Sequence, residues 1–452
     1  MNQPGHDERR YAKLFIPMFL FSLAWVVLGL IIDSPAKVLD GMQTIFFSSD
    51  ILITDYMATA GVGTAFVNAG LVCLFSLALL YFSDDPVNGF TLVELGLMAG
   101  FSLFGKNLLN IIPIVLGTYL YAKLKQEPFS KYLAVSLLTT ALSPLVSFLA
   151  FHEEKPMPLL ALITGLLIGF VMPPLAAYTF RIQNGMNLYN VGFACGLLGM
   201  ILVPVLTVLN HAPTQNLFWA TGYNLSLGAG MLAFCLFLIL FGTFRGGKDA
   251  WRRYGHLLRT SGRLPSDYLR TFGLPTICIN MGFNGLLCAA YILAVGGDLN
   301  GPTLGGILTV MGFSAYGKHP VNTAPVIFGI FLGNLVNNVP LDNPTMQIAG
   351  LFGTTLAPIS GVFGWPFGIL AGFLHSAVVL HCGTPVGGVN LYNNGFSGGL
   401  IAIVLYPILM ALVYHRKPTL QDEEFYDIFE DDSPLTEEQL DIHKDEGEQM
   451  PH

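Results

Sequence analysis

The stretch "NLYNVGFACGL" at residues 187–197 returns at residues 390–400 as "NLYNNGFSGGL". Each phrase sets two Asn, a Tyr and several Gly inside an otherwise apolar region. Polar amides are costly in such surroundings unless they find hydrogen-bond partners. The recurrence therefore predicts that one domain occurs twice and that the phrase has a role in both copies.

The duplication extends well beyond this phrase. Residues 87–123 align without gaps on 299–335 at an offset of 212, with 13 identities in 37 positions. Residues 165–200 align on 368–403 at an offset of 203, with 13 identities in 36 positions. Shared apolar composition would not place Asn, Lys, Tyr and Pro in register, so we infer an internal duplication.

The composition is that of a membrane protein. Of 452 residues, 53% are hydrophobic and 11% are charged, whereas soluble domains carry about 25% charged residues. Residues 13–32 are long enough to form an uncleaved membrane-spanning helix. Shorter apolar pieces at 91–104 and 303–316, broken by Gly and Pro, occupy matching positions in the two copies. Such pieces predict discontinuous or re-entrant helices.

These patterns predict an all-α polytopic membrane protein with two internal repeats. Its expected parts are a tail and first transmembrane helix (1–50), membrane repeat 1 (51–212), a linking transmembrane helix and basic cytoplasmic connection (213–271), membrane repeat 2 (272–416) and an acidic, largely disordered tail (417–452). From Gln421 onward the chain holds 13 acidic residues and one Lys, so the net charge of −8 divides into −12 there and +4 elsewhere.

The basic residues predict an orientation. Residues 245–270 hold seven Lys or Arg against two Asp, and short basic connections stay on the cytoplasmic side. Both termini are then expected in the cytoplasm, and the two repeats are expected to be inverted. Lys123, Lys125 and Lys131 would lie outside in this scheme, which the same rule disfavours.

The repeated phrase has two readings. Gly and Asn are common where membrane helices pack closely, so the phrase could serve packing alone. The functional reading is a broken helix whose polar groups line a cavity near the middle of the membrane. Its expected solute-binding residues are Asn187, Tyr189, Asn190, Asn390, Tyr392 and Asn393.

A second phrase, "GFSLFGK" ending at Lys106 and "GFSAYGK" ending at Lys318, carries a charge. The lysines could anchor to lipid headgroups, which would leave a neutral solute. Alternatively, they lie at re-entrant tips, and Asn110 and Asn322 help them bind a solute. A buried cation needs a partner, and the only nearby acid is Glu94, which we expect at the membrane surface. A small anion such as a carboxylate is the expected partner.

Enzyme signatures are weak. "GFSG" at 395–398 fits the GxSG pattern of rhomboid proteases, with Ser397 as the nucleophile. That chemistry needs a His base within reach, but His375 and His381 precede the Ser, and the first copy has Ala194 instead. We expect packed histidines, no enzyme, no cofactor and no metal site, since the six Cys are scattered through apolar segments without paired spacing.

With both repeats in view, residues 50–410 resemble a bacterial family of polytopic membrane proteins of unknown function that carry one domain twice. The architecture is also similar to that of urea-transporter-like, inverted-repeat transport proteins, without their signatures. The resulting expectation is a transporter or channel for a small polar solute in the cell membrane, with a proton or sodium as a possible coupling ion. No nucleic acid is expected, and an oligomer is compatible with the sequence. The alternatives are a neutral-solute channel, an intramembrane enzyme, or a scaffold that recruits partners through its acidic tail.

Overall fold

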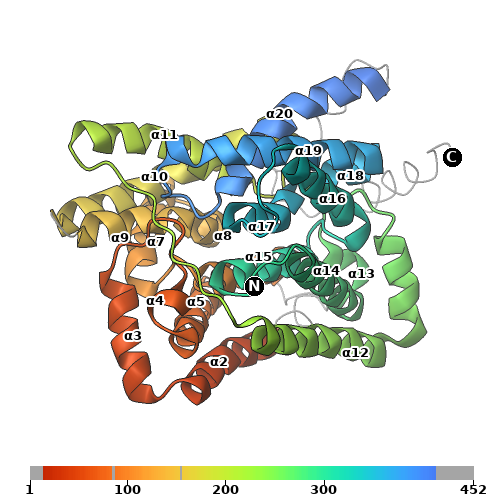
Figure 1. Ribbon diagram of the computed structural model, residues 1–452, viewed down its shortest axis with the longest axis horizontal. Helices are drawn as coiled ribbons and strands as arrows, with labels where there is room; N and C mark the ends of the chain where they lie inside the picture. The colour runs from red at the N-terminus through yellow and green to blue at the C-terminus, as the bar shows by residue number, and fades with distance from the viewer. Residues whose placement is uncertain (1–13, 84–86, 153–154, 414–452) are drawn as a thin grey trace. The chain divides into compact units, whose positions relative to one another are not determined.

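The computed structural model describes residues 14–83, 87–152 and 155–413 (Figure 1). These residues form α-helices and short 3-10 helices, and their one β-type contact is an isolated parallel bridge between Thr54 and Phe218. Within these described ranges, eleven helical segments are long and apolar enough to cross a membrane. The predicted all-α polytopic class is confirmed. Residues up to Tyr406 form one compact unit, and a second begins at Pro407.

The helices of the first copy follow one another with short connections. They are α2 (Phe15–Ile32), α3 (Pro35–Phe47), α4 (Tyr56–Thr59), α5 (Val62–Phe82), α6 (Gly89–Phe101), α7 (Leu108–Lys125), α8 (Ser130–Thr139), η1 (Thr140–Leu142), α9 (Ser143–Phe151), α10 (Pro158–Gln183) and α11 (Asn190–Val208).

The second copy repeats this order. Its helices are α12 (Asn224–Leu257), α13 (Tyr268–Phe272), α14 (Leu274–Ala294), α15 (Gly301–Phe313), α16 (Pro320–Val336), α17 (Pro344–Phe352), η2 (Gly353–Leu356), α18 (Ala357–Phe363), α19 (Trp365–Cys382), η3 (Thr384–Val386) and α20 (Asn393–Val413).

The duplicated unit begins earlier than residue 51. Helix α12 is broken at Gly247, whose backbone is not helical, and the 212-residue offset places this break beside the α2–α3 junction. Helix α2 packs on α5 as α12 packs on α14. The two arms of α12 are therefore the counterparts of α2 and α3, and the segment predicted as a linker belongs to the second copy.

The same local signals start the equivalent helices. Asn88 and Asn300 each form a capping box, with Thr91 and Thr303, at the first residues of α6 and α15. Asn107 and His319 do the same, with Asn110 and Asn322, for α7 and α16. These side chains satisfy backbone N–H groups that the first helical turn leaves free.

Helices α6 and α15 cross each other in opposite directions, backbone against backbone. A Cβ atom built on Gly100 would lie 2.6 Å from the carbonyl oxygen of Gly305, and one on Gly305 would lie 2.6 Å from that of Gly100. The order of the other neighbours reverses along the pair: Gly89 lies beside Ala315, Gly96 beside Leu308, and Gly301 beside Leu103.

Several pairs of equivalent residues among the described ones contact each other, which locates a pseudo-two-fold axis. Gly96 meets its own counterpart Leu308. The rings of Tyr189 and Tyr392 are 5.0 Å apart, and the rings of Phe193 and Phe396 stack at 5.8 Å. Only residues beside a rotation axis can contact their own equivalents in the other copy. Because α6 and α15 cross in antiparallel directions, this axis is perpendicular to both helices.

Each copy contains a helix that is too short to span the hydrocarbon and a helical pair that is interrupted by a 3-10 turn. Helices α6 and α15 have 13 residues each, or about 20 Å, against about 30 Å of hydrocarbon. Helices α8 and α9 are separated by η1, and α17 and α18 by η2. These interrupted pairs at 130–151 and 344–363 are the most buried of the candidate spans.

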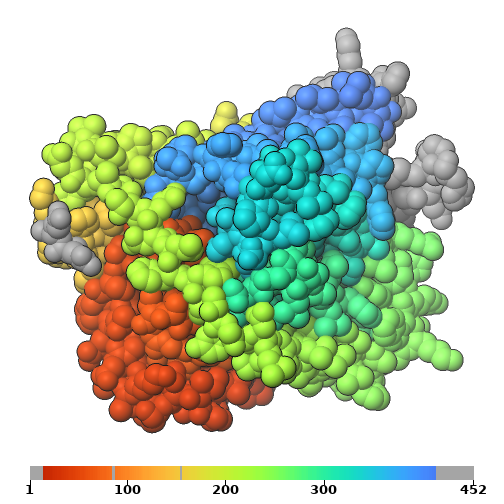
Figure 2. Space-filling model, viewed as in Figure 1, coloured from red at the N-terminus to blue at the C-terminus, as the bar shows by residue number. Residues whose placement is uncertain are grey.

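The segment between the copies runs across the molecular face shown in Figure 2, from α11 to α12. It pairs with the first copy through four backbone hydrogen bonds: Ile53 N to Asn216 O, Asn216 N to Leu52 O, Phe218 N to Ile53 O and Asp55 N to Phe218 O. This segment, predicted as part of a linking transmembrane helix, is not helical before Asn224, and the N–H groups of Asn216, Phe218 and Ala220 bond to the first copy instead.

The crossing predicts a large difference between two glycine variants. Gly100→Ala would force a Cβ against the backbone of α15, so the free energy of unfolding should fall by about 1–3 kcal/mol. Gly230→Ala, on α12 with nothing within 4 Å, should leave stability unchanged or slightly raised. Thermal unfolding of both purified variants in one detergent compares them, and equal melting temperatures would contradict the crossing.

Candidate functional site

Two loops with the same backbone path end the crossing helices. We call residues 102–107 and 314–319 the lysine loops. Gly105 and Gly317 have φ angles of 112° and 105°, which favour glycine. The next N–H, of Lys106 or Lys318, donates back to Phe101 or Phe313. Each turn directs its lysine into the protein.

A buried asparagine holds each lysine loop. Asn68 Nδ2 donates to the carbonyl oxygens of Ser102 and Lys106 at 2.7 Å. Asn280 Nδ2 donates in the same way to Ser314 and Lys318, again at 2.7 Å. These bonds satisfy carbonyl groups that the end of a helix leaves free.

Both lysine side chains are completely buried, but their partners differ. Lys318 Nζ donates to the hydroxyl of Tyr189 and, at 2.8 Å, to that of Thr354. It also lies 4.3 Å from the centre of the Tyr189 ring and 5.1 Å from that of Phe313. A lysine of the second copy thus binds a tyrosine of the first.

Lys106 is held less well. Its Nζ reaches the carbonyl oxygen of Leu137 at 3.4 Å and the sulfur of Met98 at 3.5 Å, and it lies 5.0 Å from the centre of the Phe101 ring. In the described part of the chain, neither Lys106 nor Lys318 lies within 4.0 Å of a carboxylate oxygen. Both lysine side chains contact dipoles and aromatic faces instead of a carboxylate, and burial lowers the pKa of each ammonium group.

Asn110 and Asn322 lie beside the lysine loops, but their side chains are already used. Asn110 Nδ2 donates to Gly105 O and Ser147 Oγ, both at 3.0 Å, while its Oδ1 accepts from Asn107 N. Asn322 donates to Gly317 O at 2.9 Å. These contacts fit a structural role better than the predicted direct contact with a solute.

Each NLYN phrase forms hydrogen bonds with the other copy. Asn187 Nδ2 donates to Gly395 O at 3.2 Å, and Asn390 Nδ2 donates to Gly192 O at 3.3 Å. The backbone follows the same pattern: Leu188 N bonds to Thr355 O in η2, and Leu391 N bonds to Ala141 O in η1. Each phrase lies at the start of its own helix and packs against the 3-10 turn that interrupts a helical pair in the other copy.

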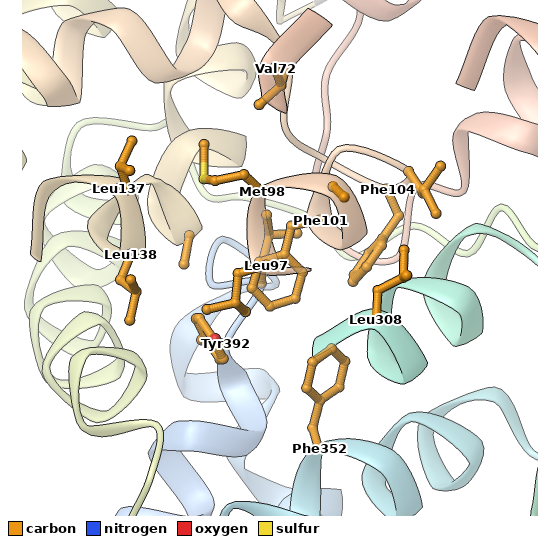
Figure 3. Close-up of a cluster of buried hydrophobic side chains, with 14 of the residues drawn as sticks. Val72, Leu97, Met98, Phe101, Phe104, Leu137, Leu138, Leu308, Phe352 and Tyr392 are labelled. Atoms are coloured by element: carbon orange, nitrogen blue, oxygen red, sulfur yellow. The ribbon is translucent and has the colours of Figure 1, made fainter. Parts of the chain in front are cut away.

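Buried rings fill the space around the lysines. We call this set the aromatic cluster: Phe101, Phe104, Tyr189, Phe313, Phe352 and Tyr392. Figure 3 shows four of them together, with the Phe101 ring 4.6 Å from that of Tyr392 and 5.5 Å from that of Phe352. Tyr189 joins this set to Lys318. The Tyr392 hydroxyl has no hydrogen-bond partner among the described residues.

A polar cavity of about 410 Å³ lies on one side of the aromatic cluster. Phe104 and Leu391 form part of its wall, and its polar lining is neutral: Gln215, Asn216, Thr345, Thr384, Asn390, Asn393 and Asn394. Of the four asparagines predicted to share a cavity, Asn390 and Asn393 line this one and Asn187 and Asn190 do not. Asn187 is buried in the contacts described above, and Asn190 Nδ2 donates to Ala176 O at 2.9 Å.

A sequence difference explains why the cavity lies beside the second copy. Helix α10 continues to Gln183, whereas α19 ends at Cys382 and gives way to the short η3 turn. The 203-residue offset aligns Pro385, in η3, with Ile182 in α10. Proline cannot donate the hydrogen bond that continues a helix, and Gly383 and Thr384 line the space that opens.

Two other predictions from sequence need correction. Glu94, expected at the membrane surface, is buried within α6 at 2% exposure. Ser397 and His375, expected out of reach because of their order in the chain, are neighbours: Ser397 Oγ lies 3.4 Å from His375 Nδ1, and His375 Nε2 lies 3.0 Å from Asn394 Oδ1. Residues on adjacent helices can meet whatever their order.

Several residues of the site were missed by the sequence analysis. Asn68 and Asn280 match at the 212-residue offset, as do Asp55 and Asp267, so continuing the alignment upstream of residue 87 would have found both pairs. Asp267 accepts from Gly89 N at 3.2 Å at the start of α6, and Asp55 accepts from Gly301 N at the start of α15. Thr354 matches Thr140 when α9 is aligned on α18 at their prolines, Pro144 and Pro358, so a third aligned block would have found it.

The tyrosines predict an asymmetric response to removal of a hydroxyl. Tyr189→Phe deletes an acceptor of the Lys318 ammonium, and losing a charged hydrogen bond should cost about 1.5–3 kcal/mol of unfolding free energy. Tyr392→Phe deletes a hydroxyl without a described partner, so stability should change by less than about 0.5 kcal/mol. Thermal unfolding of the two variants checks this, and equal losses would contradict the assigned contacts.

Comparison with known proteins agrees with the duplicated architecture. A family model described as a protein of unknown function (DUF1576) matches residues 34–208 and again residues 247–411. Both matches begin ahead of the repeat boundaries predicted at 51 and 272. No curated protein and no solved structure matches the chain significantly. Since the two matches cover most of its length, the chain belongs to the DUF1576 family and carries its domain twice.

Proposed function

We propose that this protein moves a small polar solute, with a carboxylate-sized anion as the favoured class, along a path between the two copies. The observation that carries the proposal is the pair of equivalent, fully buried lysines without a described carboxylate partner. Burying an unpaired cation costs several kcal/mol. A fold does not need to incur this cost twice unless the charges serve a ligand.

The surroundings of the lysines support an anion. Lys106 Nζ has only two long contacts, at 3.4 and 3.5 Å, so its capacity to donate is largely unused. The nearby ends of the 3-10 turns and the Tyr189 and Thr354 hydroxyls supply further dipoles for a ligand. An anion arriving between the copies would pair with the ammonium groups and lower their desolvation cost.

The cavity supports a transport pathway with a closed inner end. Its volume of about 410 Å³ suits a small molecule, and its neutral amides would admit a solute without binding it tightly. The aromatic cluster contributes Phe104 to the wall of this cavity and contacts Lys318 through Tyr189. We propose that movement of the interrupted pairs α8–α9 and α17–α18 displaces the cluster, since broken helices are hinges in many transporters.

The pseudo-two-fold axis supports alternating access. If α6 and α15 lie across the membrane, the axis lies in the membrane plane, the copies are inverted, and the lysine loops are re-entrant tips. The cavity beside the second copy would then close as an equivalent one opens beside the first. We place the protein in the cell membrane, with the basic connection at 245–270 in the cytoplasm.

Two alternatives have specific support. The cavity lining is rich in amides and carries no charged side chain among the described residues, which would suit a neutral solute. The Ser397–His375–Asn394 arrangement would suit an intramembrane hydrolase. Against the latter, Ser397 and His375 are fully buried, and Ser397 Oγ also donates to Asn394 O at 3.2 Å.

Uptake into proteoliposomes tests the proposed solute class. With labelled formate and acetate as anionic probes and urea and glycerol as neutral probes, we expect anion uptake. It should fall more than about tenfold in Lys106→Gln and in Lys318→Gln, because a lost charge partner costs at least about 2 kcal/mol. Lys248→Gln, on the exposed face of α12, and Ser397→Ala should keep uptake. Urea or glycerol uptake that survives both lysine variants would favour the neutral channel.

Cysteine labelling tests the inversion with a matched pair. Asp40 and Arg252 are equivalent at the 212-residue offset, and both are exposed. In cells that express Asp40→Cys or Arg252→Cys, a membrane-impermeant maleimide should label the first from outside and the second only after permeabilisation. The parent chain, with its six cysteines buried, is the control. Labelling of both variants from one side would rule out inversion.

A further inference from the structure

A buried carboxylate lies against the first lysine loop and has no counterpart in the second copy. Asp50, in the connection between α3 and α4, is fully buried. Its Oδ2 accepts from Asn107 Nδ2 at 3.2 Å and from Asn110 Nδ2 at 3.1 Å. Its Oδ1 has no hydrogen-bond partner among the described residues. Asp50 therefore binds both members of the capping box that follows Lys106.

The second copy builds the same loop without a carboxylate. Gly262 takes the place of Asp50 at the 212-residue offset. There, backbone carbonyl groups act as acceptors: His319 Nε2 lies 2.9 Å from Thr260 O, and Asn322 Nδ2 lies 3.5 Å from Ser261 O. The fold of the loop thus needs acceptors but not a charge.

A second paired difference accompanies the first. Ser147, which contacts Asn110, corresponds to Gly361 when α9 is aligned on α18 at their prolines. A Cβ on Gly361 would lie 1.9 Å from Ser261 O, so the absence of a side chain at Gly361 leaves room for the backbone of Ser261 in the second copy. In the first copy, side chains of Asp50 and Ser147 occupy this place.

The groups that face Asp50 are otherwise uncharged. They are the Tyr56 phenol from α4, the amides of Asn107 and Asn110 at the start of α7, the Ser147 hydroxyl from α9 and, near Asn107, the Ile45 carbonyl group from α3. Among the described residues, no Lys or Arg lies within 4.0 Å of the carboxylate.

This environment favours a proton over a metal cation. Asp50 lies outside the candidate spans, and burial raises the pKa of its carboxyl to about 7, against the lowering effect of the neighbouring polar groups of Ser147, Tyr56 and Asn110. A metal cation needs several oxygen ligands, but amide N–H groups occupy the Oδ2 side. A proton needs only the free lone pair on Oδ1.

We propose that Asp50 is a proton-binding site that controls the first lysine loop. The ionised carboxylate holds Asn107 and Asn110 by charge-assisted hydrogen bonds. A proton taken up on Oδ1 removes the charge, weakens both bonds and frees the loop that carries Lys106. The link to solute movement rests on the proposed function, and it makes proton uptake and anion binding by Lys106 concerted events.

Hydrogen exchange of the two lysine loops tests the proposal without a solute. The purified protein is compared at about pH 5 and about pH 8, on either side of the raised pKa, with rates corrected for intrinsic exchange. Peptides covering residues 102–112 should be less protected at the lower pH, while those covering 314–324 should not change. Equal responses of the two loops, or none, would overturn the proposal.

Variants assign the response to the carboxyl group. Asp50→Asn should abolish the pH response of residues 102–112, and Asp40→Asn, an exposed carboxylate on α3, should leave it intact. If Asp50→Asn does not fold, the double variant Asp50→Gly with Ser147→Gly recreates the pair found in the second copy. A pH response that persists in either Asp50 variant would contradict its assignment to the Asp50 carboxyl group.

Thermal stability gives an independent reading. Since the folded pKa lies above the ordinary 3.8, the folded protein binds more protons than the unfolded chain between about pH 4 and about pH 7. Asp50 therefore makes the melting temperature fall as pH rises through this window, and Asp50→Asn should flatten that fall. Failure of anion uptake in proteoliposomes would reject the proposed function but not this proton site, whereas an unchanged pH profile would reject the site alone.

Discussion

The antiparallel crossing of α6 and α15 is the contact on which the rest of the structure depends. Its close approach is possible because glycines face the opposing backbone, as Gly100 and Gly305 do. The crossing brings the start of each helix to the other copy, where Asp55 or Asp267 satisfies its free N–H groups. Each copy therefore completes the other, and neither could bury its short helix alone.

The crossing also explains why so many polar residues occur twice. Short and interrupted helices leave backbone groups free in an apolar interior, and each free group must find a partner. Asn68 and Asn280 supply it for the lysine loops, and Asn187 and Asn390 supply it across the axis. Most of the duplicated asparagines are thus explained by the free backbone groups to which they donate hydrogen bonds. The duplicated lysines are explained less well in this way, since Lys106 reaches one backbone carbonyl group at 3.4 Å and Lys318 bonds to side-chain hydroxyls.

Differences between the copies are informative for the same reason. Where the fold needs only an acceptor, as beside Asn322, backbone carbonyl groups are sufficient. The first copy instead has Asp50, and the second copy replaces the end of a helix with Pro385 beside a cavity. The two copies therefore share one backbone plan but differ in where they carry a buried carboxylate and where a helix end gives way to a cavity.

The sequence by itself determined the membrane class, the duplication, the helix-starting asparagines and the two lysine phrases. These features are local or periodic, so composition, spacing and capping chemistry are enough to read them. Only the tertiary structure decided which asparagines line the cavity, that Asp50 lies beside the capping box after Lys106, and that His375 reaches Ser397. Those contacts join residues on separate helices, such as Asp50 and Asn107, which are 57 positions apart. No local pattern encodes such pairs, because they arise from the way separate helices pack against one another in the folded chain.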